Sequence, residues 1–148
     1  MAPTLDELQV LLPETSIVLA ASAADRDSAI REAGGLLVAA GAVEADYVEQ
    51  MLERERIVST FVGDGIAMPH GTLTSKNDVI SEALALLVLT DPIDWAGQPV
   101  TLVIGIAAHG RRYITLLSQL AAALLDEGRA DSLRAARTPD EVRALLVS

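Results

Sequence analysis

The hydrophobic positions of this chain follow two periodicities, one typical of buried strands and one typical of amphipathic helices. Near-continuous apolar runs, as in sheets that are covered on both faces, predict strands. Between these runs, apolar residues recur every three or four positions and predict helices. The strands are expected at about 16–20, 83–89 and 100–107, and the helices at about 25–40, 44–55 and 111–125.

Turn and cap residues add shorter elements to this pattern. Gly63-Asp64-Gly65 is a strong turn signal and predicts two short strands within residues 59–68. Pro69-His70-Gly71 then interrupts regular structure. A short helix is expected at about 130–137, and Thr138, Pro139 and Glu141 form a cap that opens the last helix.

The alternation of helices with buried strands predicts a layered α/β fold. A length of 148 residues fits one domain, spanning residues 1–148, with a core of its own. Hydrophobic residues make up 51% of the chain and charged residues 22%, which argues against disorder.

Charge and composition exclude several classes of function. With 11 basic and 21 acidic residues the net charge is -10, so nucleic acids and anionic membrane surfaces are repelled. The absence of cysteine excludes disulfides and thiolate chemistry, and two histidines leave little for a zinc site. The start of the chain lacks the features of a signal peptide, and no apolar run is long enough to span a bilayer. We therefore expect a cytoplasmic protein without direct membrane insertion.

His70 is the first candidate for chemistry. Pro69 before it fixes the backbone, and Gly71 after it allows close approach of another chain. This context predicts an imidazole that is constrained and accessible. The alternative is an ordinary histidine in a surface loop.

Arg54 is the second candidate, because it continues the apolar stripe of its helix. It follows Tyr47 and Met51 at spacings of seven and three residues. A charge on that stripe needs a partner. The alternative is a side chain that extends to solvent or contacts the carbonyl groups at the end of the helix.

The third candidate is the segment from His109 to Tyr113, between a buried strand and the start of a long helix. Ligands of open α/β sheets bind beyond the carboxyl ends of strands, and a helix N-terminus attracts anions. Arg111 and Arg112 are unfavourable at a helix N-terminus unless an anion binds there. The alternative is a pair of solvated arginines.

A longer stretch is more specific than any of these residues alone. It comprises Met51-Leu52-Glu53-Arg54-Glu55-Arg56, Ser59-Thr60, the run from Gly63 to Thr72, and the strand from Leu102 to Ala108. This stretch resembles the enzyme IIA domains of the mannitol/fructose type, which belong to the phosphoenolpyruvate-dependent sugar phosphotransferase system. The mannitol branch is the nearest, and the similarity extends over nearly the whole chain.

The resemblance implies a single-domain fold with a mixed β-sheet sandwiched between α-helices. It implies a phosphotransferase component in which His70 accepts a phosphoryl group from the histidine-containing phosphocarrier protein. His70 then donates the group to a cysteine of a IIB domain, for mannitol or a related polyol. Arg54 is implied to hold the phosphoryl group, and Thr60 and Gly71 are further candidates for binding or orienting it. Neither a metal nor a cofactor is expected, because the reaction needs alignment and positive charge.

One position departs from the pattern of the family. Members of the mannitol type usually carry a second active-site histidine on the helix that follows the Gly-Ile-Ala-Ala strand. An ungapped alignment places Tyr113 there, and His109 lies four residues earlier. Either His109 serves in its place as a catalytic residue, or Tyr113 supplies the hydrogen bond that orients the phosphoryl group. In both cases Arg111, at the start of the helix, is a further candidate for binding that group.

Two alternatives to a role in sugar uptake remain open. A regulatory phosphoprotein of the same fold would signal through its phosphorylation state. An unrelated domain that binds a small ligand is the third possibility.

The departure from the family pattern is testable by mutation. If Tyr113 donates a hydrogen bond to the phosphoryl group, Tyr113→Phe slows transfer by about tenfold, the equivalent of about 1.4 kcal/mol. If His109 is the donor, which we favour, His109→Ala has the larger effect, mostly at mildly acid pH. Unchanged rates in both variants over roughly pH 5.5–8, where histidine titrates, would exclude both residues from the site.

Overall fold

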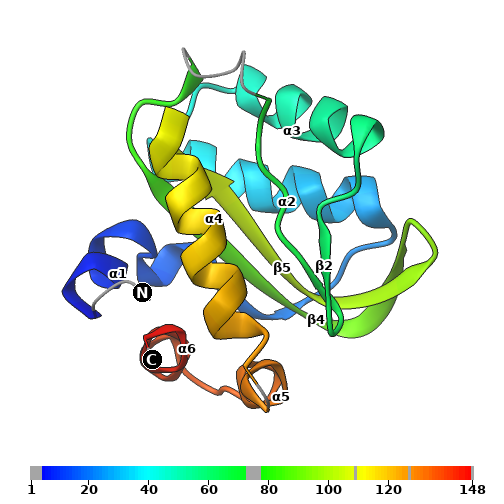
Figure 1. Cartoon of the computed structure of the whole chain (residues 1–148), viewed down its shortest axis with the longest axis vertical. Helices are drawn as coiled ribbons and strands as arrows, with labels where there is room; N and C mark the ends of the chain where they lie inside the picture. The colour runs from blue at the N-terminus through cyan, green and yellow to red at the C-terminus, as the bar shows by residue number, and fades with distance from the viewer. Residues whose placement is uncertain (1–4, 73–77, 109, 127, 148) are drawn as a thin grey trace.

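The computed structural model describes residues 5–72, 78–108, 110–126 and 128–147, and the side chains of residues 110–113, 116 and 117 lie outside that description. Within these residues a five-stranded sheet is combined with six α-helices and one short 3-10 turn, Glu14–Ser16 (Figure 1). The helices are α1 (Leu5–Leu11), α2 (Arg26–Ala39), α3 (Asp46–Ile57), α4 (Gly110–Leu124), α5 (Arg129–Arg134) and α6 (Pro139–Leu146). The strands are β1 (Ile17–Ala21), β2 (Phe61–Gly63), β3 (Ile66–Ala67), β4 (Ala83–Trp95) and β5 (Gln98–Ala107).

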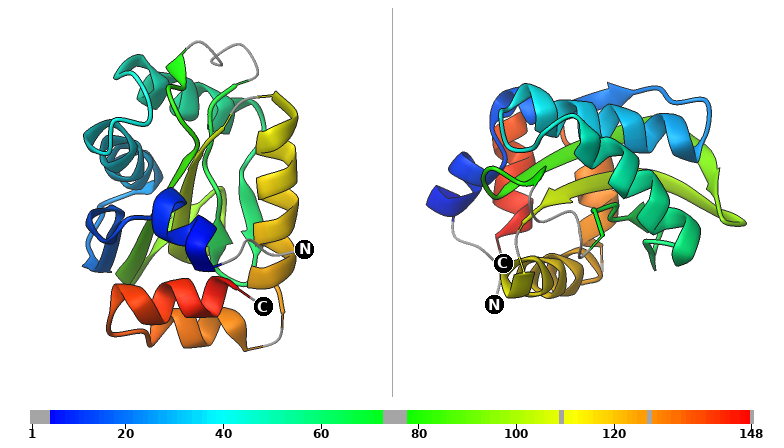
Figure 2. Two further views of the ribbon diagram at one scale, coloured as in Figure 1. Left: turned by 90° about the vertical axis from the view of Figure 1, so that its left-hand side faces the viewer. Right: turned by 90° about the horizontal axis from the view of Figure 1, so that it is seen from above.

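The sheet is mixed and has the strand order β1-β4-β5-β3-β2. β4 and β5 form an antiparallel hairpin at its centre. β1 adds in parallel to β4, and β3 adds in parallel to β5, with β2 antiparallel at the edge. Helices α2 and α3 lie on one side of the sheet and α4 on the other, so the predicted α/β sandwich is confirmed (Figure 2).

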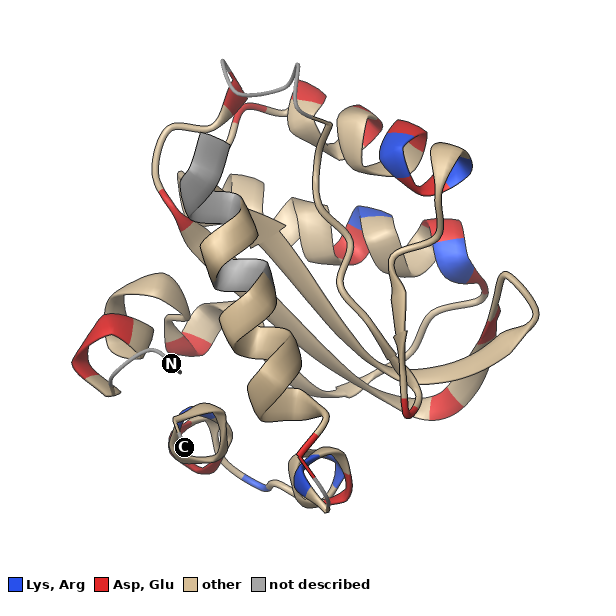
Figure 3. Cartoon of the chain, viewed as in Figure 1, with Lys and Arg blue, Asp and Glu red and all other residues tan. Residues whose placement is uncertain are grey.

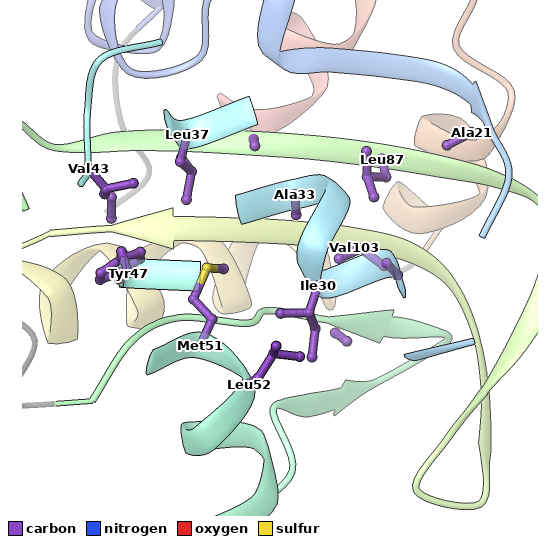
Figure 4. Close-up of a cluster of buried hydrophobic side chains, with 14 of the residues drawn as sticks. Ala21, Ile30, Ala33, Leu37, Val43, Tyr47, Met51, Leu52, Leu87 and Val103 are labelled. Atoms are coloured by element: carbon purple, nitrogen blue, oxygen red, sulfur yellow. The ribbon is translucent and has the colours of Figure 1, made fainter. Parts of the chain in front are cut away.

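The central strands divide the core into two clusters because successive side chains of a strand point to opposite faces. Leu87 and Val103 face α2 and α3, where they pack near Ile30, Ala33 and other apolar side chains of those helices (Figure 4). The neighbouring positions face the other cluster, with residues of α1, α4, α5 and α6. The sheet is thus buried on both faces, as the continuous apolar runs predict.

The structure differs from the sequence-based expectation at two places. β4 continues to Trp95, past the end of the apolar run at Leu89, because its last residues still pair with β5. Asp91 and Pro92 are exposed where the register shifts, so they separate the buried Ile93 and Trp95 from the apolar run before them. Helix α1 is also missing from the expectation, since a seven-residue helix with two buried leucines shows little periodicity.

The cap of the last helix is confirmed with one change in detail. The hydroxyl group of Thr138 accepts a hydrogen bond from the amide of Glu141 at 3.2 Å, and Pro139 lies in the first turn. The carboxylate of Glu141 accepts from the amide of Arg137 at 3.0 Å, one residue before the expected donor. Both contacts satisfy backbone groups that the helix leaves without partners.

No helix in the described part of the chain combines the length and the apolar composition that crossing a membrane requires.

Helices α2 and α3 approach closely at Gly34. A Cβ atom placed on Gly34 would lie 2.9 Å from the Cγ2 atom of Val48 on α3, whereas the same atom on the adjacent Gly35 meets nothing within 4 Å. The two glycines therefore form a natural pair for testing this contact, since both lie inside α2.

We expect Gly34→Ala to destabilise the protein by about 1 kcal/mol, because overpacking costs about 1–3 kcal/mol and the helix regains only part of it. Gly35→Ala should stabilise it by roughly 0.5–1 kcal/mol, because alanine loses less entropy in a helix. Urea denaturation of both variants measures the difference. Equal stabilities would contradict the close contact between α2 and α3.

Candidate active site

His70 lies beside the carboxyl end of β5. The amide of Ile106 donates a hydrogen bond to the carbonyl of Pro69 at 3.0 Å, and His70 forms a parallel bridge with Ile106. The backbone after β3 thus continues alongside β5 beyond the end of the regular strand. This pairing places His70 where ligands of α/β sheets collect.

The imidazole of His70 is held through one of its nitrogens. Nδ1 lies 2.9 Å from the carbonyl oxygen of Met68, which only accepts hydrogen bonds. Nδ1 therefore carries the proton of the neutral ring, and Nε2 carries the lone pair. Nε2 is therefore the nitrogen of this ring that can act as a nucleophile.

Burial determines the charge of this ring. His70 is only 3% exposed, so the expectation of an accessible imidazole is wrong, because pairing with β5 draws the segment into the structure. Desolvation lowers the pKa of His70 below its usual value of 6.5; the hydrogen bond to Met68 opposes this shift, and the positive charge of Arg54 adds to it. The imidazole is consequently neutral at pH 7, the state in which it is a nucleophile.

Tyr47 fastens this segment to β5 and was missed as a site residue by the sequence analysis. Its hydroxyl group donates to the carbonyl of Ile106 at 2.7 Å and accepts from the amide of Gly71 at 2.9 Å. A tyrosine on the apolar stripe of a helix needs such a partner for its hydroxyl group, which is the signal that could have identified it. The amide of Gly71, expected to bind the phosphoryl group, is engaged by Tyr47 in this structure.

Arg54 lies in the last turn of α3, close enough to affect the pKa of His70. Its side chain is partly buried, and Nη1 donates to the carbonyl of Val58 at 2.6 Å. The contact with carbonyl groups at the end of the helix, given above as the alternative for Arg54, is therefore present. Arg54 and Arg56 alternate with Glu53 and Glu55 at this end of α3, where basic and acidic residues lie side by side (Figure 3).

Glu55 and Thr60 form a buried contact behind the site. The carboxylate of Glu55, 3% exposed, accepts from the amide of Thr60 at 2.9 Å, from its hydroxyl group at 2.5 Å, and from Nε1 of Trp95 at 2.8 Å. The hydroxyl group of Thr60, expected to orient the phosphoryl group, thus faces Glu55. Sequence reasoning missed Glu55, although a glutamate beside a candidate arginine was visible in the motif.

Three candidate residues cannot be placed through their side chains. His109 lies outside the described residues, as do the side chains of Arg111 and Tyr113. The backbone places the start of α4 at Gly110, shortly after β5 ends at Ala107. The roles of His109, Arg111 and Tyr113 stay predictions.

Two comparisons of the sequence with known proteins point to one family. Residues 10–148 match the family model for "Phosphoenolpyruvate-dependent sugar phosphotransferase system, EIIA 2". The mannitol-specific phosphotransferase enzyme IIA component of Halalkalibacterium halodurans is 41% identical over 138 residues, which cover 93% of this chain and 95% of that relative.

Solved structures agree with this match. The crystal structure of IIA mannitol from Escherichia coli superposes with a TM-score of 0.85 at 36% identity, covering 92% of this chain and 99% of that one. The complex of enzyme IIAMTL with phosphorylated enzyme IIBMTL from the same organism gives the same TM-score and identity, covering 91% of this chain and 96% of the matched chain.

The contact between Arg54 and Val58 allows the two interpretations of this arginine to be separated. Arg54→Lys keeps the positive charge but loses the planar fork of donors. We expect phosphoryl transfer to slow by roughly ten- to a hundredfold, the equivalent of a hydrogen bond to a charged group worth about 1.5–3 kcal/mol. Single-turnover transfer and thermal unfolding are measured on the same preparation. If the variant unfolds more readily but its folded fraction transfers at the original rate, the role of Arg54 is structural.

Proposed function

The chain belongs to the EIIA 2 family of the phosphoenolpyruvate-dependent sugar phosphotransferase system, and on this premise we propose that His70 carries the phosphoryl group on Nε2. The protein is a phosphotransferase component of that system. The observation that supports His70 is the bond between its Nδ1 atom and the carbonyl of Met68, which leaves the lone pair on Nε2 of a neutral ring.

In the first half-reaction, the lone pair of Nε2 attacks the phosphorus atom of the phosphorylated histidine of the phosphocarrier protein. The new N–P bond forms as the donor's N–P bond breaks, and the donor's nitrogen keeps the electron pair. Nδ1 of His70 keeps its proton throughout. In the second half-reaction, the acceptor group of a IIB domain attacks the same phosphorus atom and releases Nε2. Both steps are in-line transfers through a loose transition state.

Positive groups stabilise the charge that the peripheral oxygens carry during transfer. A guanidinium has five N–H donors, so the bond of Arg54 to Val58 still allows it to hold a phosphoryl oxygen. The start of α4, which follows β5 closely, supplies the partial positive charge of a helix N-terminus. These groups perform the task without a metal ion.

The two partners of the protein follow from this chemistry. The phosphocarrier protein supplies the phosphoryl group, and a IIB domain receives it, as the complex of the Escherichia coli homologue with phosphorylated IIB supports. Because His70 is 3% exposed, docking has to move the groups that cover the ring. Each partner docks, exchanges the group and leaves, so the interfaces are small and transient.

The substrate of the permease that this component serves is mannitol or a related polyol. The 41% identity to a mannitol-specific component, over nearly the full length of both chains, favours this branch. We place the reaction in the cytoplasm. The single domain comprises residues 1–148, of which the family model covers 10–148.

His70 is expected to be the only phosphorylation site of the chain. After incubation with phosphoenolpyruvate, enzyme I and the phosphocarrier protein, acid-labile label should appear on the wild type and be absent from His70→Ala. His109→Ala removes the one other histidine and should still reach full labelling at the end point. Full labelling of His70→Ala would refute the assignment.

The labelled protein also separates uptake from regulation. Transfer to a mannitol-type IIB domain, faster than to a fructose-type one, supports the uptake component. A phosphorylated protein that donates to no IIB domain, but binds a target according to its phosphorylation state, would favour the regulatory alternative.

A further inference from the structure

Glu55 is a buried carboxylate that hydrogen-bond donors compensate in place of a cation. Moving a carboxylate out of water is expensive unless a cation or several donors compensate. Within the described part of the chain, no arginine or lysine forms an ion pair with Glu55, and its partners are the neutral donors of Thr60 and Trp95. Two of these bonds hold Thr60, which links Glu55 to the segment before His70.

A directed series of hydrogen bonds leads from His70 to this carboxylate. Nδ1–H of His70 donates to the carbonyl of Met68 at 2.9 Å, and the amide of Met68 donates to the carbonyl of Thr60 at 3.0 Å. The amide of Thr60 donates to the carboxylate of Glu55 at 2.9 Å. Each contact fixes the position of the next residue, so the series links the place of the imidazole to that of the carboxylate.

We propose that Glu55 is a positioning residue for phosphoryl transfer, acting on His70 through the backbone of Thr60 and Met68. The proposal rests on the function proposed above for His70. The carboxylate holds Thr60 by two bonds, which fixes the carbonyl that receives the amide of Met68. The carbonyl of Met68 in turn fixes the plane of the imidazole and keeps the proton on Nδ1.

The charge of Glu55 matters in addition to its geometry. When Nε2 bonds to phosphorus, the ring becomes electron-poor and its Nδ1–H becomes a stronger donor. The negative charge of Glu55 stabilises that electron-poor ring through space. The negative charge of Glu55 also raises the pKa of His70, against the lowering caused by burial and by Arg54.

The three bonds of Glu55 permit a substitution that removes the charge and keeps the contacts. Oε2 accepts from both the amide of Thr60 and Nε1 of Trp95, while Oε1 meets only the hydroxyl group of Thr60. In Glu55→Gln the amide oxygen can take the place of Oε2, and the amide nitrogen can donate to the hydroxyl group, which also accepts. Thr60→Val complements it, because the charge stays and the hydroxyl contact is lost.

The test uses the full chain labelled with 15N-histidine. The imidazole nitrogen shifts report the tautomer and the pKa of His70, and His109→Ala assigns the two histidines. We expect Glu55→Gln to fold, to raise the fraction of ring with the proton on Nε2, and to lower the pKa of His70. Single-turnover transfer from the phosphorylated phosphocarrier protein should slow about tenfold, while the KM for that partner changes less than about twofold.

Leu37→Ala is the control for lost stability. Leu37 is fully buried in the core cluster that also contains Trp95, and its side chain cannot form hydrogen bonds with Glu55, Thr60 or His70. Its folded fraction should keep the wild-type tautomer and rate. A wild-type imidazole spectrum in Glu55→Gln, whatever its rate, would overturn the proposal. Should Glu55→Gln not fold, Thr60→Val decides in the same way: a shifted tautomer with slower transfer supports the proposal, and an unchanged spectrum overturns it.

The experiment distinguishes failure of the role proposed for Glu55 from failure of the function proposed for His70. If the wild type carries the label on His70 but Glu55→Gln matches it in tautomer and rate, only the role of Glu55 fails. If the wild type carries no label on His70, the proposed function itself fails.

Discussion

The site depends on one hydrogen bond, from Nδ1 of His70 to the carbonyl of Met68. It assigns the proton to one nitrogen, directs the other toward the reaction, and holds the ring in a fixed plane. A histidine in a free loop would sample both tautomers and many orientations, and each transfer would then require that the ring be ordered first. Holding the ring in place before a partner docks removes that entropic part of the barrier.

The position of this hydrogen bond depends on the backbone around Met68, and contacts from β5, Tyr47 and Glu55 hold that backbone. β5 pairs with the segment through Pro69 and Ile106, and Tyr47 of α3 bridges Ile106 to Gly71. Glu55, on the same helix, holds Thr60 and thereby Met68. Helix α3 therefore supports the segment on both sides of His70, and it also carries Arg54. Packing of α3 on α2 at Gly34 sets the place of this helix in the molecule.

The electrostatics of the site differ from those of the chain as a whole. A net charge of -10 repels phosphate at long range, so the fold has to gather positive groups where the transfer takes place. At the end of α3, Arg54 is the group close enough to His70 to lower the pKa of that ring. Burial and the charge of Arg54 lower the pKa of His70, and the charge of Glu55 acts in the opposite direction.

The sequence by itself determined the α/β class, most helices and strands, and the stretch around His70 and Arg54, because periodicity, turns and short motifs are local properties of a chain. It did not reveal that β4 extends to Trp95, since Asp91 and Pro92 interrupt the apolar run and pairing with β5 carries the strand past them. It also did not reveal Tyr47 or Glu55 as site residues, or that His70 is buried. Those features arise from contacts between α3 and residues far along the chain, such as Ile106 and Trp95, which only the tertiary structure brings together.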